Sequence, residues 1–378
     1  MKFTCNVATL KRAVALLKLD EPKTHLSITA QEAQLQFRCD TANGGFCIDH
    51  TMPAEVEAPG TVTVSVDALP RICEYTTSET LRFSSHEWHG CVDIEGEPHR
   101  HAVRTYTHTE KWQNPAFQKL TDVHGYEIPA SQFGTALKSV LFAAEQPSDS
   151  ETEKQKRVML MGALFHRHDG EDRLVTTDGT RMVVLTMPSV RELADTEEPV
   201  PMRAMPYKAC VKMIGLIESL KPEVCRLRFT ESAMAFEIED VVLRCVWPPE
   251  GDYPNYLSIF EKPSASLAVK VNRERLLRAL QIIHVDDNPS HRAAFRFSDG
   301  QLTVGNNTRL GKSEAGVPIQ YEGPDMAVTA NSWFFEEALL HTDATDITLW
   351  LLPDAERSLG PIHLELAQNF RYMVMPLK

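Results

Sequence analysis

The stretch ASQFGTALKSVLFAAE (130–145), followed by LMGALFHRHDGEDRLVTTDG (160–179), decides the fold, because the same combination occurs three times along the chain. Phe133, Leu137, Val140 and Leu141 fall on one face of a helix by their spacing. The strand pair after it contains Asp169-Gly170 between two strand-like runs, where a two-residue hairpin turn is expected. The two related combinations are NVATLKRAVALLK (6–18) with HLSITAQEAQLQFRCD (25–40), and VNRERLLRALQII (271–283) with AAFRFSDGQLTVGNN (293–307).

Each repeat continues in the same order, which predicts its full set of elements. A third strand, such as MVVLTMP (182–188), comes before a second helix and a closing group of alternating strands. The second helices are VDALPRICEYT (66–76), PYKACVKMIGLIESL (206–220) and NSWFFEEALLHT (331–342). We therefore predict an α+β fold of three similar domains, each with antiparallel sheets outside and two helices on one face. The predicted domains are residues 1–125, 126–259 and 260–378.

The composition is that of a water-soluble globular protein of 378 residues, 43% of them hydrophobic and 24% charged. No apolar run approaches the roughly 20 residues needed to span a bilayer, and the start MKFTCNVATLKRAV has no apolar signal core. The eight cysteines form no CxxC pair, which favours free thiols in a reducing cytoplasm. The net charge of -13 argues against nucleic-acid binding over the whole surface but allows a basic lining inside an acidic body.

Positive charges gather on the polar sides of the predicted helices. One interpretation is that these are simply solvated helix faces. In the other, the repeats curve so that the same faces point inward and line a channel that meets phosphates without reading bases. Glu336 and Glu337 make the last helix acidic, so such a lining would be uneven. The candidate DNA-binding residues are Lys11, Arg12, Lys18, Lys138, Lys208, Lys212, Arg275 and Arg278.

Several segments in order resemble the bacterial DNA polymerase III beta subunit, the beta sliding clamp. LVTTDGTRMVVLTMP (174–188) is similar to its ATDGHRLA segment, and GDYPNYLSIF (251–260) to its G-x-F-P-D-Y-x-x-V motif. RYMVMPLK (371–378) resembles its Y-V-V-M-P-M-R-L ending, and MKFT (1–4) its start. The resemblance covers the whole chain and is strongest from about residue 158. It implies a non-enzymatic processivity factor, in which two three-domain subunits close head to tail into a ring around duplex DNA.

The resemblance also implies a hydrophobic cleft between the second and third domains that binds short peptides of the Gln-Leu-x-Leu-Phe type. Such peptides belong to polymerases, the clamp loader and other partners. Met373 and Met375 alternate on a terminal strand, and methionine adapts to varied apolar ligands, although by spacing alone they could simply complete a core. Arg181 could donate hydrogen bonds to a peptide. By position the cleft residues are Leu160, Thr177, Gly179, Thr180, Arg181, Met182, Pro254, Ile259, Met373, Met375, Pro376 and Leu377.

The chain departs from the family pattern at several positions. Thr180 replaces a frequent histidine, Leu257 and Ser258 replace an arginine pair, and the final leucine is missing after Lys378. These departures indicate a divergent clamp with altered partner preference. The ring-closing contact in the family would here use His101 and Val103 against Ile282 and Ile283, and a histidine at that edge favours closure that weakens at low pH.

Two other functions compete with this interpretation. His86, His89, Cys91, His99 and His101 could hold zinc in an enzyme, but an exposed polar hairpin is the simpler explanation, since no HExxH spacing is present. No GxSxG, P-loop or GxGxxG motif occurs, so we expect neither a cofactor nor a metal. A clamp-like protein that binds replication partners without encircling DNA is the second alternative.

Overall fold

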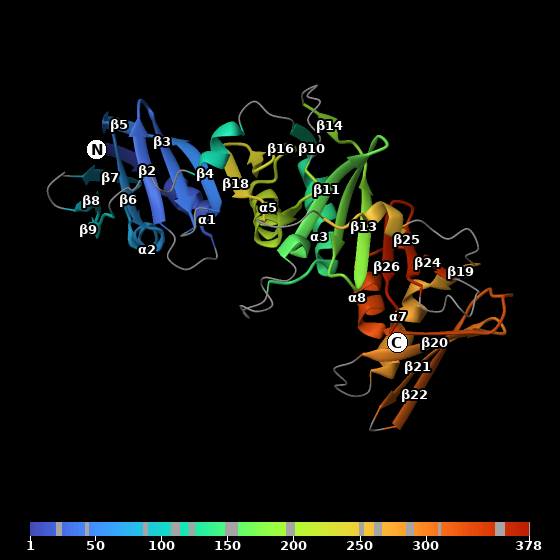
Figure 1. The fold of residues 1–378 in the computed structure, drawn as a ribbon. Coiled ribbons are helices and arrows are strands. Elements are labelled where there is room, and N and C mark those ends of the chain that lie inside the picture. The colour runs from blue at the N-terminus through green and yellow to red at the C-terminus, as the bar shows by residue number, and fades with distance from the viewer. Residues whose placement is uncertain are drawn as a thin grey trace. The chain divides into compact units, whose positions relative to one another are not determined.

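The computed structural model describes residues 1–19, 25–41, 45–85, 90–106, 114–120, 125–147, 158–193, 201–248, 253–260, 267–284, 291–308, 311–351 and 360–377. Within them one order of elements occurs three times: a strand, a helix, a group of strands, a second helix and three closing strands (Figure 1). The predicted α+β class and the threefold repeat are therefore confirmed.

The first two repeats contain the helices and strands that the sequence predicts for them. The first runs through β1 (Lys2–Asn6), α1 (Val7–Leu17), β2 (His25–Gln31), β3 (Gln34–Asp40), β4 (Phe46–Pro53), β5 (Glu55–Ala58), β6 (Gly60–Ser65), α2 (Ala68–Tyr75), β7 (Thr80–Ser85), β8 (Cys91–Gly96) and β9 (His99–Arg104). The second runs through β10 (Gly125–Pro129), α3 (Ala130–Val140), β11 (Gly162–His168), β12 (Glu171–Thr177), β13 (Arg181–Met187), β14 (Arg191–Glu192), β15 (Ala204–Pro206), α5 (Tyr207–Leu220), β16 (Val224–Phe229), β17 (Ala233–Ile238) and β18 (Val241–Val246).

The third repeat is preceded by α6 (Tyr256–Phe260), a short helix that the sequence did not predict. Short 3-10 turns accompany the earlier repeats at Pro115–Lys119, Leu141–Ala143 and Val158–Leu160. The third repeat itself runs through β19 (Leu267–Asn272), α7 (Arg273–Ile283), β20 (Arg292–Ser298), β21 (Gln301–Thr308), β22 (Gly311–Pro318), β23 (Met326–Asn331), α8 (Ser332–Leu340), β24 (Asp346–Leu351), β25 (Ile362–Ala367) and β26 (Phe370–Val374).

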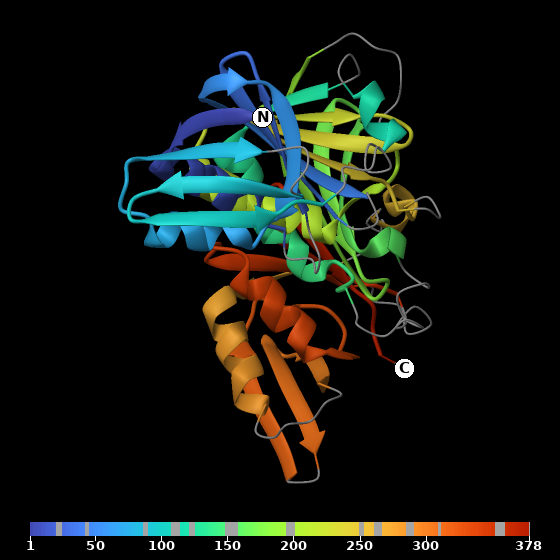
Figure 2. The same ribbon diagram turned by 90° about the vertical axis from the view of Figure 1, so that its left-hand side faces the viewer.

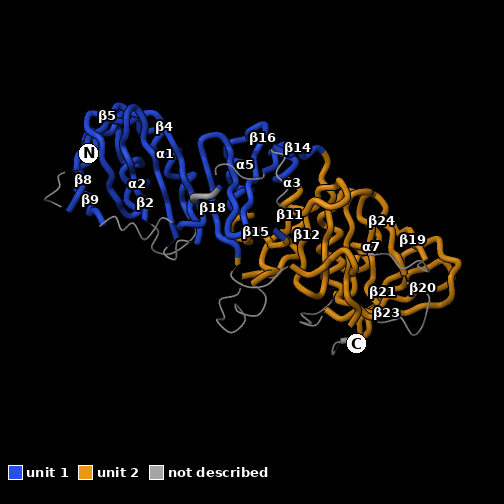
Figure 3. The backbone as a smooth tube through the Cα atoms, turned by 45° about the horizontal axis from the view of Figure 1, so that its top comes forward, with its two compact units in different colours: residues 1–134, 189–201, 211–247 blue, residues 135–188, 202–210, 248–378 orange. Residues whose placement is uncertain are grey.

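The chain divides into two compact units, coloured separately in Figure 3. Unit 1 comprises residues 1–134, 189–201 and 211–247, and unit 2 comprises residues 135–188, 202–210 and 248–378. Unit 1 contains a nine-stranded sheet, β14-β10-β16-β17-β18-β4-β3-β2-β6, and a five-stranded sheet, β5-β1-β7-β8-β9. Unit 2 contains an eight-stranded sheet, β15-β11-β12-β13-β26-β25-β24-β19, and a four-stranded sheet, β22-β21-β20-β23.

The two large sheets each combine strands of neighbouring repeats. In unit 1, β4 of the first repeat pairs with β18 of the second. In unit 2, β13 of the second repeat pairs with β26 of the third. Because backbone hydrogen bonds continue across both junctions, the division into three domains at residues 125 and 259 stays a prediction.

The helices bury their apolar faces against these sheets, as their spacing predicts. Leu10, Val14 and Leu17 of α1 are buried, and α7 lies beside α8 next to the strands of the four-stranded sheet (Figure 2). Asparagine residues cap the starts of α1 and α7. The Asn6 side chain accepts a hydrogen bond from Thr9 N at 3.1 Å, and that of Asn272 accepts one from Arg275 N at 3.1 Å. Such caps satisfy backbone N–H groups that a helix leaves unpaired at its start.

The predicted two-residue turns are confirmed by their backbone angles. Asp169 and Gly170 have φ values of 52° and 76°, and Asp299 and Gly300 have 44° and 71°. Both central residues of a type I′ turn need positive φ, which Asp-Gly supplies at little cost. The flanking residues His168 and Glu171 pair directly, so this turn fixes the register of β11 with β12.

The beginning of each repeat differs from the prediction. Each opens with a strand of five or six residues, β1, β10 or β19, before its first helix. These strands are too short for their alternation to stand out from the helical pattern that follows. None of the helices in the described part of the chain is long and apolar enough to cross a bilayer.

Candidate functional site

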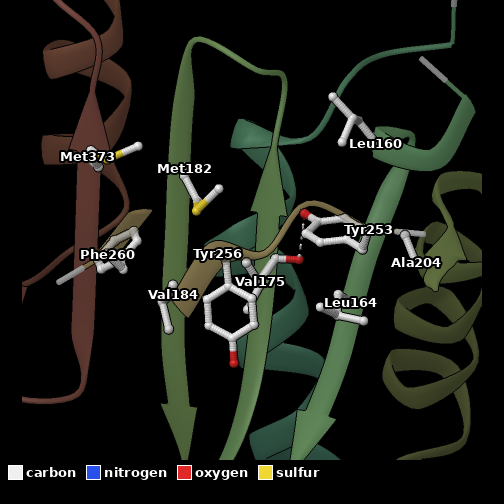
Figure 4. Close-up of a cluster of buried hydrophobic side chains, with 10 residues drawn as sticks. All are labelled: Leu160, Leu164, Val175, Met182, Val184, Ala204, Tyr253, Tyr256, Phe260 and Met373. Carbon is white, nitrogen blue, oxygen red and sulfur yellow. Dashed lines mark hydrogen bonds between the residues drawn. The ribbon is translucent and has the colours of Figure 1, made fainter. Parts of the chain in front are cut away.

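An apolar cluster on the eight-stranded sheet of unit 2 collects the central residues of the predicted peptide site. Leu164 of β11, Val175 of β12, Met182 and Val184 of β13, and Met373 of β26 share one face of that sheet. Side chains alternate between the two faces of a strand, and Met182 stands directly opposite Met373. The complete cluster is Leu160, Leu164, Val175, Met182, Val184, Ala204, Tyr253, Tyr256, Phe260 and Met373 (Figure 4).

The segment Tyr253–Phe260 covers this face and is fastened to it by its aromatic residues. The hydroxyl of Tyr253 donates to Val175 O at 3.2 Å, and its backbone N donates to Met202 O at 2.9 Å. The hydroxyl of Tyr256 lies 2.9 Å from His166 Nδ1. Burial raises the pKa of both tyrosines and lowers that of His166, so all three are neutral at pH 7. The side chains of the cluster itself are therefore uncharged, although the central guanidinium carbon of Arg371 lies 5.2 Å from the ring centre of Phe260.

Two apolar side chains at the edge of the cluster remain accessible. Ile259 of α6 is 40% exposed and Met375, just past β26, is 39% exposed. Met159, Met202 and Leu257 pack against the cluster and are only partly buried. Burying a side chain of this size in a complex stabilises it by about 1.5–3 kcal/mol. This edge thus presents apolar surface to water.

A tight turn, residues Thr177–Arg181, borders the cluster. The Asp178 carboxylate accepts hydrogen bonds from Thr180 N at 2.8 Å and from Arg181 N at 3.0 Å. Thr177 Oγ1 donates to Arg181 O at 2.6 Å, and Gly179 takes a φ of 87° that favours glycine. Gly179 and Thr180 are exposed at its tip. The backbone O of Thr180 accepts from Met375 N at 2.8 Å, which joins the turn to the terminal segment.

Arg181 does not stand at the surface as a donor for a ligand. It is 8% exposed, and its Nε donates to Asp178 Oδ2 at 2.9 Å while Nη2 donates to Phe142 O at 2.8 Å. Its Nη1 is paired with Glu337 Oε2. Each guanidinium nitrogen therefore has an acceptor inside unit 2, which contradicts the idea that Arg181 offers its hydrogen bonds to a peptide.

The predicted peptide-site residues thus fall into three groups by position. Leu160, Met182 and Met373 belong to the buried cluster, and Thr177 and Arg181 are buried in the turn beside it. The exposed or partly buried members are Gly179, Thr180, Pro254, Ile259, Met375, Pro376 and Leu377. Sequence reasoning missed Leu164, Val175, Val184, Ala204, Tyr253, Tyr256 and Phe260. The alternation on β12 and β13 could have indicated Val175 and Val184.

The predicted DNA-binding cations lie at the surface of the two units. In unit 1, Lys11, Arg12 and Lys18 are exposed, and Lys212 Nζ donates to Lys18 O at 2.7 Å. In unit 2, Lys138, Lys208, Arg275 and Arg278 are exposed. Arg278 lies 4.0 Å from Glu274, and such an exposed pair is worth little in water. Apart from Lys212, which is partly buried, these side chains are accessible to phosphates.

The last helix is not acidic at its surface, contrary to the prediction. Glu337 is turned inward to Arg181. Glu336 is 9% exposed, and its carboxylate lies 3.2 Å from His284 Nδ1. The large exposed side chains of α8 are instead Trp333 and Leu340. The carboxylates of this helix are therefore engaged within unit 2.

The predicted ring-closing residues lie on two separate elements. His101 and Val103 are partly buried on β9, an edge strand of the five-stranded sheet in unit 1. Ile282, at the end of α7 in unit 2, is 59% exposed, whereas Ile283 is fully buried. A contact at this end of α7 would consequently use Ile282 and not Ile283.

The zinc alternative gains no support from the residues that the structure describes. His86 and His89 lie outside them. Among the described residues no group of three or more His, Cys, Asp or Glu side chains is arranged to hold a metal ion. All eight cysteines are described as thiols outside any disulfide, and seven of them are buried, in agreement with the interpretation from their spacing.

In sequence the chain is similar to curated beta sliding clamps. It is 22% identical to that of Chlamydia pneumoniae over 271 residues, which cover 71% of this chain and 69% of the relative. It is 21% identical to that of Treponema pallidum over 345 residues, 89% and 87% of the two chains. Across such matches the chain spans between 54% and 87% of the relative's length. No family model matches the chain.

Solved structures match over the whole length. The DNA polymerase sliding clamp of Caulobacter crescentus has a TM-score of 0.85 at 16% identity, with 100% of both chains covered. The Bartonella birtlesii sliding clamp, solved with bound griselimycin, has a TM-score of 0.82 at 18% identity and covers 100% and 99% of the two chains. The fold is therefore that of a DNA sliding clamp. In sequence and in fold, the chain is thus similar to the bacterial beta sliding clamps.

Proposed function

We propose that the chain is a processivity factor: it encircles duplex DNA without reading its sequence and tethers replication proteins to it. The observation that carries the proposal is the match of the whole chain to sliding-clamp structures, joined to an apolar cluster with an accessible edge in unit 2. A protein with this role performs no chemistry of its own, and it would act in the cytoplasm as a ring of two copies.

The charge distribution supports contact with the DNA backbone. Cations such as Lys11, Arg12 and Arg275 are exposed on helices, although the chain as a whole carries a net charge of -13. Contacts to phosphates are independent of sequence and are screened by salt. Such contacts hold a duplex loosely enough for the protein to move along it.

The accessible edge of the apolar cluster supports binding of short partner peptides. Ile259 and Met375 are exposed beside buried Met182 and Met373, and flexible methionines can adapt to different apolar ligands. The polymerase, the clamp loader and other proteins with a clamp-binding motif would insert apolar side chains here. The same site would thus serve several partners in turn.

Retention on topologically closed DNA tests this proposal. The protein is loaded onto a nicked circular plasmid with a bacterial clamp loader and ATP, separated by gel filtration, and then treated with a restriction enzyme that linearises the plasmid. An encircling clamp stays with the circle and is lost from the linear form. Equal retention on both forms would contradict encirclement.

Size in solution separates this function from that of a partner-binding protein that does not encircle DNA. Light scattering should give twice the 42.5 kDa of one chain. A monomer that binds the partner peptide but is not retained on circular DNA would favour the second function. An acidic surface on the last helix would also favour the second function, but Glu336 and Glu337 are engaged with His284 and Arg181 inside unit 2.

A further inference from the structure

A network of polar contacts in unit 2 runs from the Thr177–Arg181 turn to α8. Arg181 is its centre, with Asp178 on one side and Glu337 on the other. Asp178 belongs to the turn itself, whereas Glu337 belongs to α8. The side chains of these three residues are 9%, 17% and 23% exposed, Arg181 first. Partial removal of a charge pair from water strengthens its attraction but makes the loss of one partner costly.

Aromatic rings hold the guanidinium of Arg181 in place. Its central carbon lies 4.3 Å from the ring centre of Phe334 and 5.6 Å from that of Phe142. Phe142 in turn stacks on His341 at 4.3 Å, and the ring of His341 donates from Nδ1 to Glu337 O at 2.8 Å. Planar arginine suits such stacking and forked pairing, and lysine cannot reproduce both.

The other end of the chain of contacts reaches the edge of the peptide site. The Asp178 carboxylate accepts hydrogen bonds from the backbone N of Thr180 at 2.8 Å and from the Thr180 hydroxyl at 2.6 Å. The backbone O of Thr180 accepts a hydrogen bond from the backbone N of Met375 at 2.8 Å. Two contacts therefore separate the partly buried carboxylate of Asp178 from Met375, the exposed methionine at the edge of the apolar cluster.

We infer that Arg181 is a positioning residue, which together with Asp178 and Glu337 holds the turn and Met375 in the arrangement that a partner peptide binds. The inference rests on the proposed function, because it concerns the same peptide site. Arg181 acts through Thr180 and Met375 and does not touch the peptide. Helix α8, through Glu337, is thereby a part of the support of the site, although it contributes no exposed residue to its edge.

A role in stability alone leads to different expectations. Removal of one partner of a buried ion pair destabilises many proteins without any link to a ligand. If that were all, weakening the pair would lower the melting temperature but leave the affinity of the folded protein for peptide unchanged. A positioning role changes the affinity while the protein is still folded.

The pair Arg167–Asp172 supplies a matched control. Arg167 Nε and Nη2 donate to the two oxygens of Asp172 at 2.8 Å each, and Asp172 is 5% exposed. Leu164 of β11 and Val175 of β12 point to the face of the sheet that carries the apolar cluster. Arg167 is three residues after Leu164 and Asp172 three residues before Val175. Since side chains alternate along a strand, both lie on the opposite face. A substitution there disturbs a similar pair in the same sheet, at a distance from the edge formed by Ile259 and Met375.

The test measures the affinity of the full chain for a fluorescein-labelled peptide of the Gln-Leu-x-Leu-Phe type by fluorescence polarisation. The variants are Glu337→Gln, which keeps the size of the side chain, Arg181→Lys, the double variant and Arg167→Lys, each confirmed as folded by circular dichroism. We expect Glu337→Gln and Arg181→Lys each to weaken binding by about 2- to 30-fold. The double variant should lose less than the product of the two, because both changes break the same contact.

Hydrogen exchange adds a local measurement at Met375. A general loss of stability would speed exchange throughout the protein and not at this amide in particular. The amide of Met375 should exchange faster in Glu337→Gln than in Arg167→Lys at equal global stability. If the wild type binds the peptide and folded Glu337→Gln and Arg181→Lys bind it equally well, the inference is wrong, whereas the proposed site stands. A wild type that does not bind the peptide overturns the proposed site and the inference with it.

Discussion

Met182 and Met373 are direct cross-strand partners on β13 and β26, although one belongs to the second repeat and the other to the third. Both side chains are buried in the apolar cluster of unit 2. The third repeat therefore completes a hydrophobic surface that the second repeat begins. A site formed in this way depends on the pairing of two repeats, and it can differ from the surfaces that the repeats share.

Truncation of Met373 should destabilise the protein. Met373→Ala removes a side chain that is 4% exposed, and large-to-small changes in a core cost about 2–5 kcal/mol. Met375→Ala is the control, because its side chain is 39% exposed and surface changes usually stay within about 0.5 kcal/mol. Urea unfolding of both variants measures the difference. Equal losses would mean that Met373 does not belong to the core.

A charge at the edge of the apolar cluster should impair peptide binding and leave the fold intact. Ile259→Asp or Met375→Asp places a carboxylate where the proposed ligand is apolar, and we expect an affinity loss of about 5- to 30-fold, as for interface anchors. Leu340→Asp is the matched control, since Leu340 is an exposed apolar residue of unit 2 outside the cluster. Fluorescence polarisation with the labelled peptide measures all three. A similar loss in the control would point to a general effect.

The elements of the repeat could be predicted from the sequence because their signals are local. Asp169-Gly170 defines a turn by the φ values that two neighbouring residues adopt. The spacing of Leu10, Val14 and Leu17 likewise defines the buried face of one helix. Neither inference needs knowledge of a distant residue.

The environment of Arg181 could not be predicted in the same way. Its acceptors Phe142 and Glu337 are distant in sequence, and nothing in the letters around them indicates that they meet. Glu337 was for that reason expected on an acidic surface. The helix α6 was also missed, because a helix of five residues is defined by what it packs on, here through Tyr256 and Phe260, and not by its own periodicity.

Replacement of Asp40 should change how stability depends on pH. Burial raises the pKa of Asp40 from 3.8 to about 6, although Arg38 and Arg244 act to lower it. The folded protein thus holds this proton more tightly than the unfolded chain, so stability falls as the pH rises from about 4 to 6 and stays lower above that range. Asp40→Asn removes this loss.

The variant should therefore be more stable than wild type at pH 7.5, by about 1–3 kcal/mol, and show no such gain at pH 4. Urea unfolding at the two pH values measures the difference. A gain that is the same at both would show that ionisation of Asp40 is not its cause. A loss at pH 7.5 would show that its attraction to Arg38 outweighs burial.

The cysteines should differ in reactivity according to burial. Burial raises the pKa of the Cys5, Cys47, Cys210 and Cys225 thiols to about 12 and that of Cys73 to about 11, so almost none of their thiolate forms at pH 8. Cys91 is the one cysteine that is not buried. Titration with Ellman's reagent should modify Cys91 rapidly in the native protein and the others only after unfolding. Cys91→Ser, which should abolish the rapid phase, is the control.

Ring closure should depend on Ile282. Its side chain is 59% exposed at the end of α7, and in a closed ring we expect it to be covered by the β9 edge of the other copy. Ile282→Asp would bury a charge without a partner, which is costly, and should convert the dimer into a monomer of 42.5 kDa. Leu340→Asp, equally exposed on α8, should remain dimeric. Light scattering distinguishes the two masses, and loading on nicked circular DNA should fail only for Ile282→Asp. A dimeric Ile282→Asp would mean that the two copies meet through another surface.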